Sequence, residues 1–253
     1  MAVRFLEALC WLALAGAASS ASSPADNDDQ GERADGPCSN DMVRVVGSYC
    51  SQVEQRCLKW LDPPRLPFAR CATYSEPSRC IGRRVELDYC IDRFEYTAPG
   101  DQLPLGGQSL KSAERLCKGL GKRLCTEPEW TFACEGEEMR PYPYGFTRRP
   151  LCNQDRSDLL ERGKPWQLRD WREPSEARPA CVSWAGVFNL VGNLDEPVLR
   201  TDVAAGTPFR GALKGGWWLP GRNRCRASTT GHDDAYRGFQ VGVRCCNDIE
   251  EAR

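Results

Sequence analysis

The sequence predicts an α+β fold with little regular secondary structure, held together by disulfide staples and long ordered loops. One alternating segment and two capped segments are the clear candidates for a strand and for helices. Beyond Gly136 the chain is rich in Pro, Gly, Asn, Asp and Trp, a composition typical of turns and loops. The chain also has 15 cysteines in 253 residues, enough to crosslink such loops.

The first segment, residues 1–17, has the pattern of a secretory signal peptide. Arg4 precedes a short apolar run at 9–15, and the small residues at 15–17 resemble a cleavage site. The run is too short to be expected as a membrane anchor. We therefore expect a secreted, periplasmic or otherwise extracytoplasmic protein. Cleavage removes Cys10, one of the 15 cysteines, and leaves 14, an even number that predicts a disulfide framework.

Composition and charge exclude several classes of function. The formal net charge is −1, so the chain lacks the excess of cations with which a nucleic-acid binder displaces counterions. The only histidine is His232, and no C-x-x-C pair occurs, which argues against zinc and iron–sulfur sites. No second apolar stretch predicts a membrane span.

Two segments precede the main domain. Residues 18–36 carry five acidic residues and almost no apolar ones, and we expect them to form a disordered linker. Residues 37–84 form a cysteine-rich extension with many prolines, and its cysteines are 38, 50, 57, 71 and 80. Because five cysteines cannot all pair among themselves, Cys90 is a candidate sixth partner.

The main domain is expected over residues 85–247, followed by a tail at 248–253. Residues 85–91 alternate between polar and apolar and predict a strand. Ser109 then caps a predicted helix that has one apolar face. Gly119 and Gly121 are expected to end this helix.

A second helix is expected to open at Thr126. Glu129 stands three residues later, so the hydroxyl and the carboxylate can each accept from a backbone N–H at the helix start, an arrangement called a capping box. Further along, residues 238–245 predict a short strand.

Seven short motifs occur in a fixed order. The longest is the run AERLCKGLGKRLCTEPEW at 113–130. The others are EYT at 95–97, ACEG at 133–136, YPYG at 142–145, NLVGNLDE at 189–196, KGGW at 214–217, and the pair RCRAS at 224–228 with GVRC at 242–245. Together they resemble the formylglycine-generating enzyme (sulfatase-modifying factor) family over about residues 85–246.

The resemblance implies an irregular α+β fold related to C-type lectins. It also implies two disulfides, Cys117–Cys245 and Cys134–Cys225, which would tie the helical half to the C-terminal strands. Active members of the family oxidise a substrate cysteine with O₂ and hold copper(I) between two thiolates, which suit a soft ion.

This chain departs from the family at the copper site. Only Cys225 lies in the corresponding segment, and Pro220, which cannot bind a metal, falls where the first cysteine would stand. We therefore expect a non-catalytic binding or structural module. The alternative is an oxidase with an atypical copper site that uses Cys225.

The resemblance also implies calcium at the G-N-x-x-E element, where Asn193 and Glu196 supply hard oxygen ligands. Asp195 and Pro197 replace the tryptophans expected on either side of Glu196. The alternative is that Asn193 and Glu196 only bond to the backbone of nearby loops.

A ligand groove is expected around Trp217, Trp218, Arg222 and Arg224. Tryptophans flanked by arginines suit stacking on a sugar or a peptide. The alternative is that one tryptophan belongs to the core and the arginines are solvated. We expect a monomer that binds an unidentified peptide, protein or glycan, with neither nucleic acid nor a membrane span.

Overall fold

The computed structural model describes residues 36–160, 170–204 and 206–249. The predicted leader at 1–17, nearly all of the linker at 18–36 and residues 250–253 of the tail lie outside the described residues. The predictions made for them therefore stay predictions.

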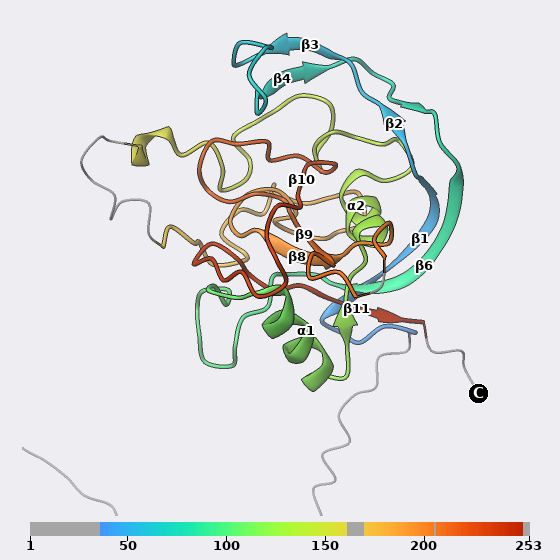
Figure 1. Ribbon diagram of the computed structural model, residues 1–253, viewed down its shortest axis with the longest axis vertical. Coiled ribbons are helices and arrows are strands. Elements are labelled where there is room, and N and C mark those ends of the chain that lie inside the picture. The colour runs from blue at the N-terminus through green and yellow to red at the C-terminus, as the bar shows by residue number, and fades with distance from the viewer. Residues whose placement is uncertain (1–35, 161–169, 205, 250–253) are drawn as a thin grey trace, which may run out of the picture. The chain divides into compact units, whose positions relative to one another are not determined.

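A four-stranded antiparallel sheet forms one side of the domain, in the order β1-β6-β11-β7. Its strands are β1 (Met42–Cys50), β6 (Arg84–Asp92), β11 (Cys245–Asp248) and β7 (Arg123–Leu124). Figure 1 shows β1 and β6 as two long ribbons that curve together. The predicted strand at 85–91 is β6.

The nine-residue strand β1 was not expected within the cysteine-rich extension. Its segment contains Met42, Val43, Val45, Val46 and Tyr49, residue types that suit a pleated surface. Every residue of β1 pairs with one of β6. The extension thus contributes an edge strand of the main sheet.

Both predicted helices form where their caps stand. Helix α1 (Leu110–Gly119) begins after Ser109, whose side chain accepts from the backbone N–H of Ser112 at 3.2 Å. Its buried face packs on the sheet through Leu110, Ala113 and Cys117.

Helix α2 (Glu127–Glu135) has the predicted capping box. The Thr126 N–H donates to Glu129 Oε2 at 2.7 Å, and Thr126 Oγ1 accepts from the Glu129 N–H at 3.4 Å. Gly136 ends the helix with φ +66°, a conformation that favours glycine. Trp130, Phe132 and Cys134 place α2 in the main core.

The rest of the domain is short strands and loops. A second sheet has the order β10-β9-β8, and two two-stranded sheets stand apart from it. The elements are β8 (Glu196–Leu199), β9 (Gly211–Lys214), β10 (Ser228–Thr229), β2 (Val53–Glu54) with β5 (Arg79–Cys80), β3 (Cys57–Trp60) with β4 (Cys71–Tyr74), and the 3-10 helix η1 (Ser157–Leu159).

The strand predicted at 238–245 begins only at Cys245. Upstream of it, Val241 forms a single bridge with Asp195. The Arg244 side chain turns into the core, where Glu196 binds it. Residues 241–244 are all buried, so this apolar segment packs into the domain without forming the predicted strand.

Seven disulfides pair all 14 cysteines of the described residues. They are Cys38–Cys90, Cys50–Cys80, Cys57–Cys71, Cys117–Cys245, Cys125–Cys246, Cys134–Cys225 and Cys152–Cys181. Such a framework points to an extracellular or ER-luminal protein, because reducing compartments keep thiols free. Among the described helices, none combines the length and apolar character needed to cross a bilayer.

Candidate functional site

A groove of about 250 Å³ lies where the resemblance places the family's reaction centre. Its walls come from the segment 213–229, from Asp195 before β8, and from Phe68 in the loop between β3 and β4. Pro220, the residue expected in place of the first copper cysteine, is part of the wall.

Cys225 is crosslinked beside this groove. Its sulfur lies 2.04 Å from that of Cys134, the partner that the resemblance implies, and both residues are fully buried. Asn223 and Ala227, on either side of Cys225, line the groove. The residues present do not fit copper(I), because neither sulfur is a thiolate and Pro220 offers no ligand atom.

The two neighbouring tryptophans have different roles. Trp217 lines the groove. Trp218 is fully buried with Leu159 and Leu194, so it is not available to a ligand. The Trp217 ring packs against those of Trp218 and Phe239, with centroids 5.1 and 5.6 Å away. The core therefore holds Trp217 in position at the groove.

The two arginines, Arg222 and Arg224, also differ in position. The Arg222 guanidinium lies over the Phe68 ring, 4.7 Å from its centroid, and both residues line the groove. Arg224 instead donates to Gln55 Oε1 at 3.1 Å and is not part of the groove wall. Of the four groove residues expected from the sequence, the structure brings Trp217 and Arg222 together.

Asp195 adds a carboxyl group to the groove. Burial and the neighbouring Glu196 charge raise the pKa of Asp195 to about 7, although a hydrogen bond from the Gly216 backbone opposes them. The groove therefore combines an aromatic face, a cation and a carboxyl that titrates near neutral pH. From the sequence, Asp195 was identified only as a departure from the family pattern.

A buried lysine holds one of the groove residues in place. Lys214 Nζ lies 3.0 Å from Ser228 Oγ, which lines the groove, and 3.4 Å from Glu127 Oε1. Ser228 and Glu127 also share a hydrogen bond. Burial lowers the pKa of Lys214 to about 8, and the Glu127 carboxylate opposes that shift. This network fixes the Ser228 hydroxyl.

The two expected calcium ligands have other partners. The Glu196 carboxylate accepts from Arg244 at 2.7 and 2.8 Å and from Trp130 Nε1 at 2.6 Å. Asn193 Oδ1 accepts from Asn153 Nδ2 at 3.0 Å. As arranged, this set does not fit a calcium ion, because its carboxylate charge is already matched by a buried guanidinium.

A second buried carboxyl lies close to Asn193. Glu95 Oε2 accepts from Asn193 Nδ2 at 2.7 Å and from Asn189 Nδ2 at 3.1 Å. Glu95 Oε1 and the nearby Ser175 Oγ have no hydrogen-bond partner among the described residues. Burial, with the charge of Glu196 added, raises the pKa of Glu95 to about 8.

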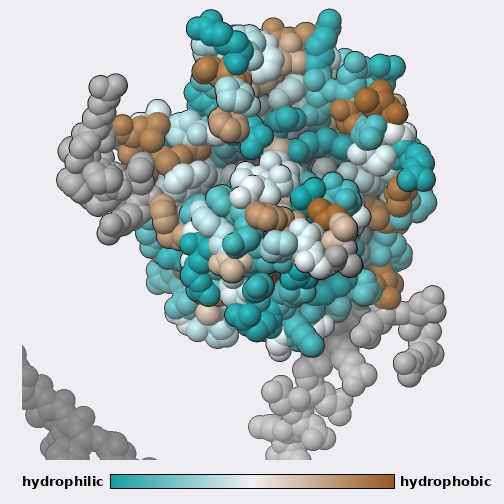
Figure 2. Space-filling model, in the orientation of Figure 1, coloured by the Kyte–Doolittle hydropathy of each residue, from teal (hydrophilic) through white to brown (hydrophobic). Residues whose placement is uncertain are grey.

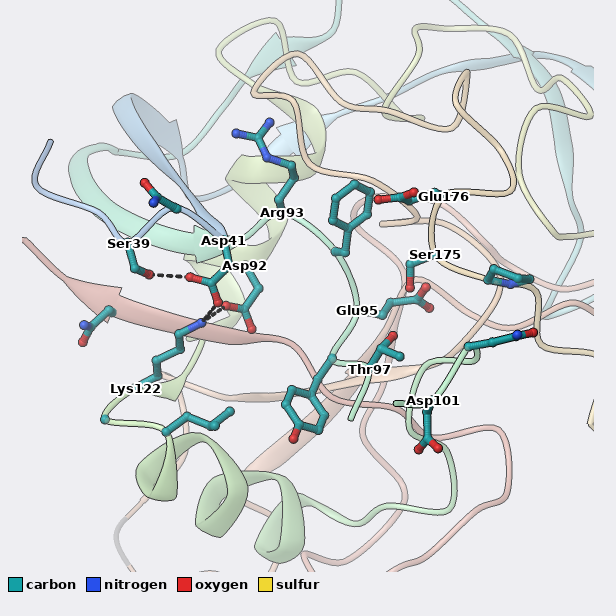
Figure 3. Close-up of a pocket in the computed structure, with 18 residues that line it drawn as sticks. Ser39, Asp41, Asp92, Arg93, Glu95, Thr97, Asp101, Lys122, Ser175 and Glu176 are labelled. Atoms are coloured by element: carbon teal, nitrogen blue, oxygen red, sulfur yellow. Dashed lines mark hydrogen bonds and ion pairs between the residues drawn. The ribbon is translucent and has the colours of Figure 1, made fainter. Parts of the chain in front are cut away.

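Glu95 and Ser175 belong to the wall of a cavity of about 1000 Å³, which Figure 3 shows. On its other side Lys122 Nζ lies 2.5 Å from Asp41 and 2.6 Å from Asp92. The sequence analysis missed this cavity because it is assembled from five separate segments, near residues 40, 95, 121, 175 and 247. Within the described ranges, no three His, Cys, Asp or Glu residues form a group suited to a metal.

Comparison with known proteins places the chain in a family. The model of the sulfatase-modifying factor enzyme 1-like domain, FGE-sulfatase, matches residues 75–249. "Inactive C-alpha-formylglycine-generating enzyme 2" of Mus musculus is 28% identical over 154 residues, which are 58% of this chain and 49% of the mouse protein. The chain thus spans about half the length of this curated relative.

Solved structures agree on the fold. PvdO from Pseudomonas aeruginosa superposes with a TM-score of 0.52 at 15% identity, covering 85% of this chain and 97% of PvdO. CarF superposes with a TM-score of 0.56 at 13% identity, covering 83% and 98% of the two chains. These likenesses confirm the predicted fold class.

Proposed function

We propose, since the chain belongs to the FGE-sulfatase family of sulfatase-modifying factor enzyme 1-like domains, that it is an exported binding module without a copper centre. The Cys134–Cys225 disulfide carries this proposal, because it occupies the one cysteine available at the family's reaction centre. The mouse relative is itself named inactive, which is consistent with loss of the chemistry within the family.

The groove suits a ligand with a flat or apolar group next to a polar one. Trp217 offers a ring for stacking, Arg222 offers a cation, and Asp195 can donate or accept a proton near neutral pH. A peptide, a protein loop or a glycan could present such a combination. The groove is small, so we expect it to take one side chain or one sugar of a larger ligand.

A thiol count with a copper(I) titration separates this proposal from the oxidase. We expect the denatured, unreduced mature protein to contain no free thiol and the folded protein to bind no copper(I) tightly. A cysteine-containing peptide incubated with it under O₂ should stay unconverted. The variant Cys134→Ser, which frees Cys225, is the positive control for the thiol assay. Tight copper(I) binding together with conversion of the peptide cysteine to an aldehyde would overturn the proposal.

The groove itself is tested with immobilised glycan and peptide arrays. Trp217→Ala should lose whatever signal the wild type gives. Trp171→Ala is the matched control, because Trp171 is an exposed tryptophan outside the groove. Equal loss in both variants, or retention in Trp217→Ala, would remove Trp217 from the binding site.

Calcium stays a prediction that rests on the resemblance alone, and no step of the proposed function depends on it. With Glu196 bound to Arg244, we expect chelation to leave the melting temperature unchanged. A rise of the melting temperature on addition of calcium would show that a different ligand set binds it.

A further inference from the structure

The hairpin of β3 and β4 concentrates the exposed apolar side chains of the domain. Of the fourteen large apolar residues that are exposed in the described ranges, five fall between positions 58 and 68, with exposures of 43–62%. They are Leu58, Trp60, Leu61, Leu66 and Phe68. Soluble proteins seldom expose so many large apolar groups together without a binding role.

The same hairpin is basic, although the whole chain has a net charge of −1. Arg56, Lys59 and Arg65 have no carboxylate partner within the described part of the chain. The single acid, Asp62, is held by Arg70 at 2.8 Å. Figure 2 shows apolar and polar surface side by side over β3 and β4, at the top of the view.

The hairpin is held in shape before it meets any partner. The Cys57–Cys71 disulfide closes it, and Pro63, Pro64 and Pro67 restrict the backbone of its loop. Figure 1 shows it at one end of the described domain, away from the main sheet. Ordering the hairpin on binding therefore costs little free energy, which favours a contact surface that already has its bound shape.

We propose that this hairpin is a membrane-surface anchor that inserts its apolar side chains at the interface of an anionic lipid bilayer. Tryptophan, leucine and phenylalanine flanked by lysine and arginine are the combination that binds at such an interface, with rings at headgroup depth and cations at the phosphates. The apolar side chains lie on a projecting hairpin. A bilayer is deformable and can accept such a hairpin without a matching pocket. Arg222, stacked on Phe68, adds a cation at the same edge.

Vesicle sedimentation tests the anchor. The mature protein is mixed with vesicles of phosphatidylcholine containing phosphatidylserine, and with vesicles of phosphatidylcholine alone. We expect co-sedimentation with the anionic vesicles that weakens with added salt. Leu61→Ser with Leu66→Ser should lower the bound fraction at least about tenfold, because each leucine loses its transfer into the apolar layer. Lys59→Glu with Arg65→Glu should abolish the preference for phosphatidylserine.

The matched control is Ile81→Ser with Val85→Ser, two residues outside the hairpin that are 54% and 47% exposed. It should sediment like the wild type, as should Trp217→Ala, so the result is independent of the groove proposal. Unchanged melting temperatures establish that the exposed substitutions leave the fold intact. The proposal is overturned if the wild-type protein does not sediment with anionic vesicles, or if the leucine variant binds them like the wild type.

Discussion

Two buried glutamates lie near each other in the domain and have opposite surroundings. Glu196, at the start of β8, meets a guanidinium and an indole N–H that satisfy its carboxylate. Glu95, beside the cavity, meets two neutral amides on one oxygen and no partner on the other. A buried carboxylate is stable as an anion only where a cation and hydrogen bonds replace water. Glu196 is therefore stable as a buried anion, whereas the charged form of Glu95 is disfavoured and its protonation depends on pH.

The largest effect is expected when the cation that faces Glu196 is removed. Arg244→Met leaves a buried, uncompensated carboxylate, and we expect a loss of about 3–5 kcal/mol of unfolding free energy. Urea denaturation measures it. A loss below about 1 kcal/mol would mean that water or another cation reaches Glu196.

Removing both charges of the Arg244–Glu196 pair should cost less stability than removing one. Arg244→Met combined with Glu196→Gln should recover about 1–3 kcal/mol relative to Arg244→Met alone, because no unpaired charge remains. The two unfolding curves are compared at one pH. A double variant less stable than Arg244→Met would show that Glu196 stabilises the fold through Trp130 and not mainly through the ion pair.

The third prediction concerns Glu95 and pH. Its pKa is raised from 4.5 to about 8, so the folded protein favours the protonated form. The contribution of Glu95 to stability is therefore largest below pH 4.5 and falls as pH rises towards 8. Glu95→Gln should match the wild type near pH 4.5 and exceed it at pH 8 by on the order of 2 kcal/mol.

Urea denaturation of both proteins across this range measures the difference. Asp41→Asn is the control, because Asp41 also lines the cavity and, against the effect of burial, its hydrogen bond from Lys122 helps to lower its pKa; this variant should not be more stable than the wild type at pH 8. A constant gap between wild type and Glu95→Gln at every pH would show that Glu95 does not titrate in this window.

The smallest effect is expected at Ser175. Its buried hydroxyl has no partner among the described residues, so Ser175→Ala should change the unfolding free energy by less than about 1 kcal/mol, in either direction. Thermal denaturation at pH 5 and pH 8 checks this. A clear loss confined to the acidic side would reveal a hydrogen bond between Ser175 and protonated Glu95.

Local signals predicted local structure well. Ser109 and Thr126 mark both helix starts, since a cap needs only residues three positions apart. The motif order predicted the family and the fold, which the comparisons confirm. Strand β1 was missed because its pairing with β6 depends on a partner forty residues away, which no local pattern reveals.

The site was harder to predict for the same reason. Trp217 and Trp218 are neighbours of one residue type, and nothing in the sequence tells which one turns into the core. Phe68 enters the groove from the extension, and Glu95 meets Asn189 and Asn193 across most of the domain. Such sites become visible only when distant segments are brought together.

The last strand of the domain also has a consequence for biosynthesis. β11 lies between β6 and β7, and its adjacent Cys245 and Cys246 crosslink to Cys117 and Cys125. During translation these two upstream thiols emerge long before their partners do. Until the ribosome has released the final strand, the nascent chain carries an unfinished sheet and reactive sulfurs. Any crosslink formed early between Cys117 and Cys125 must be broken again before the two native disulfides can form.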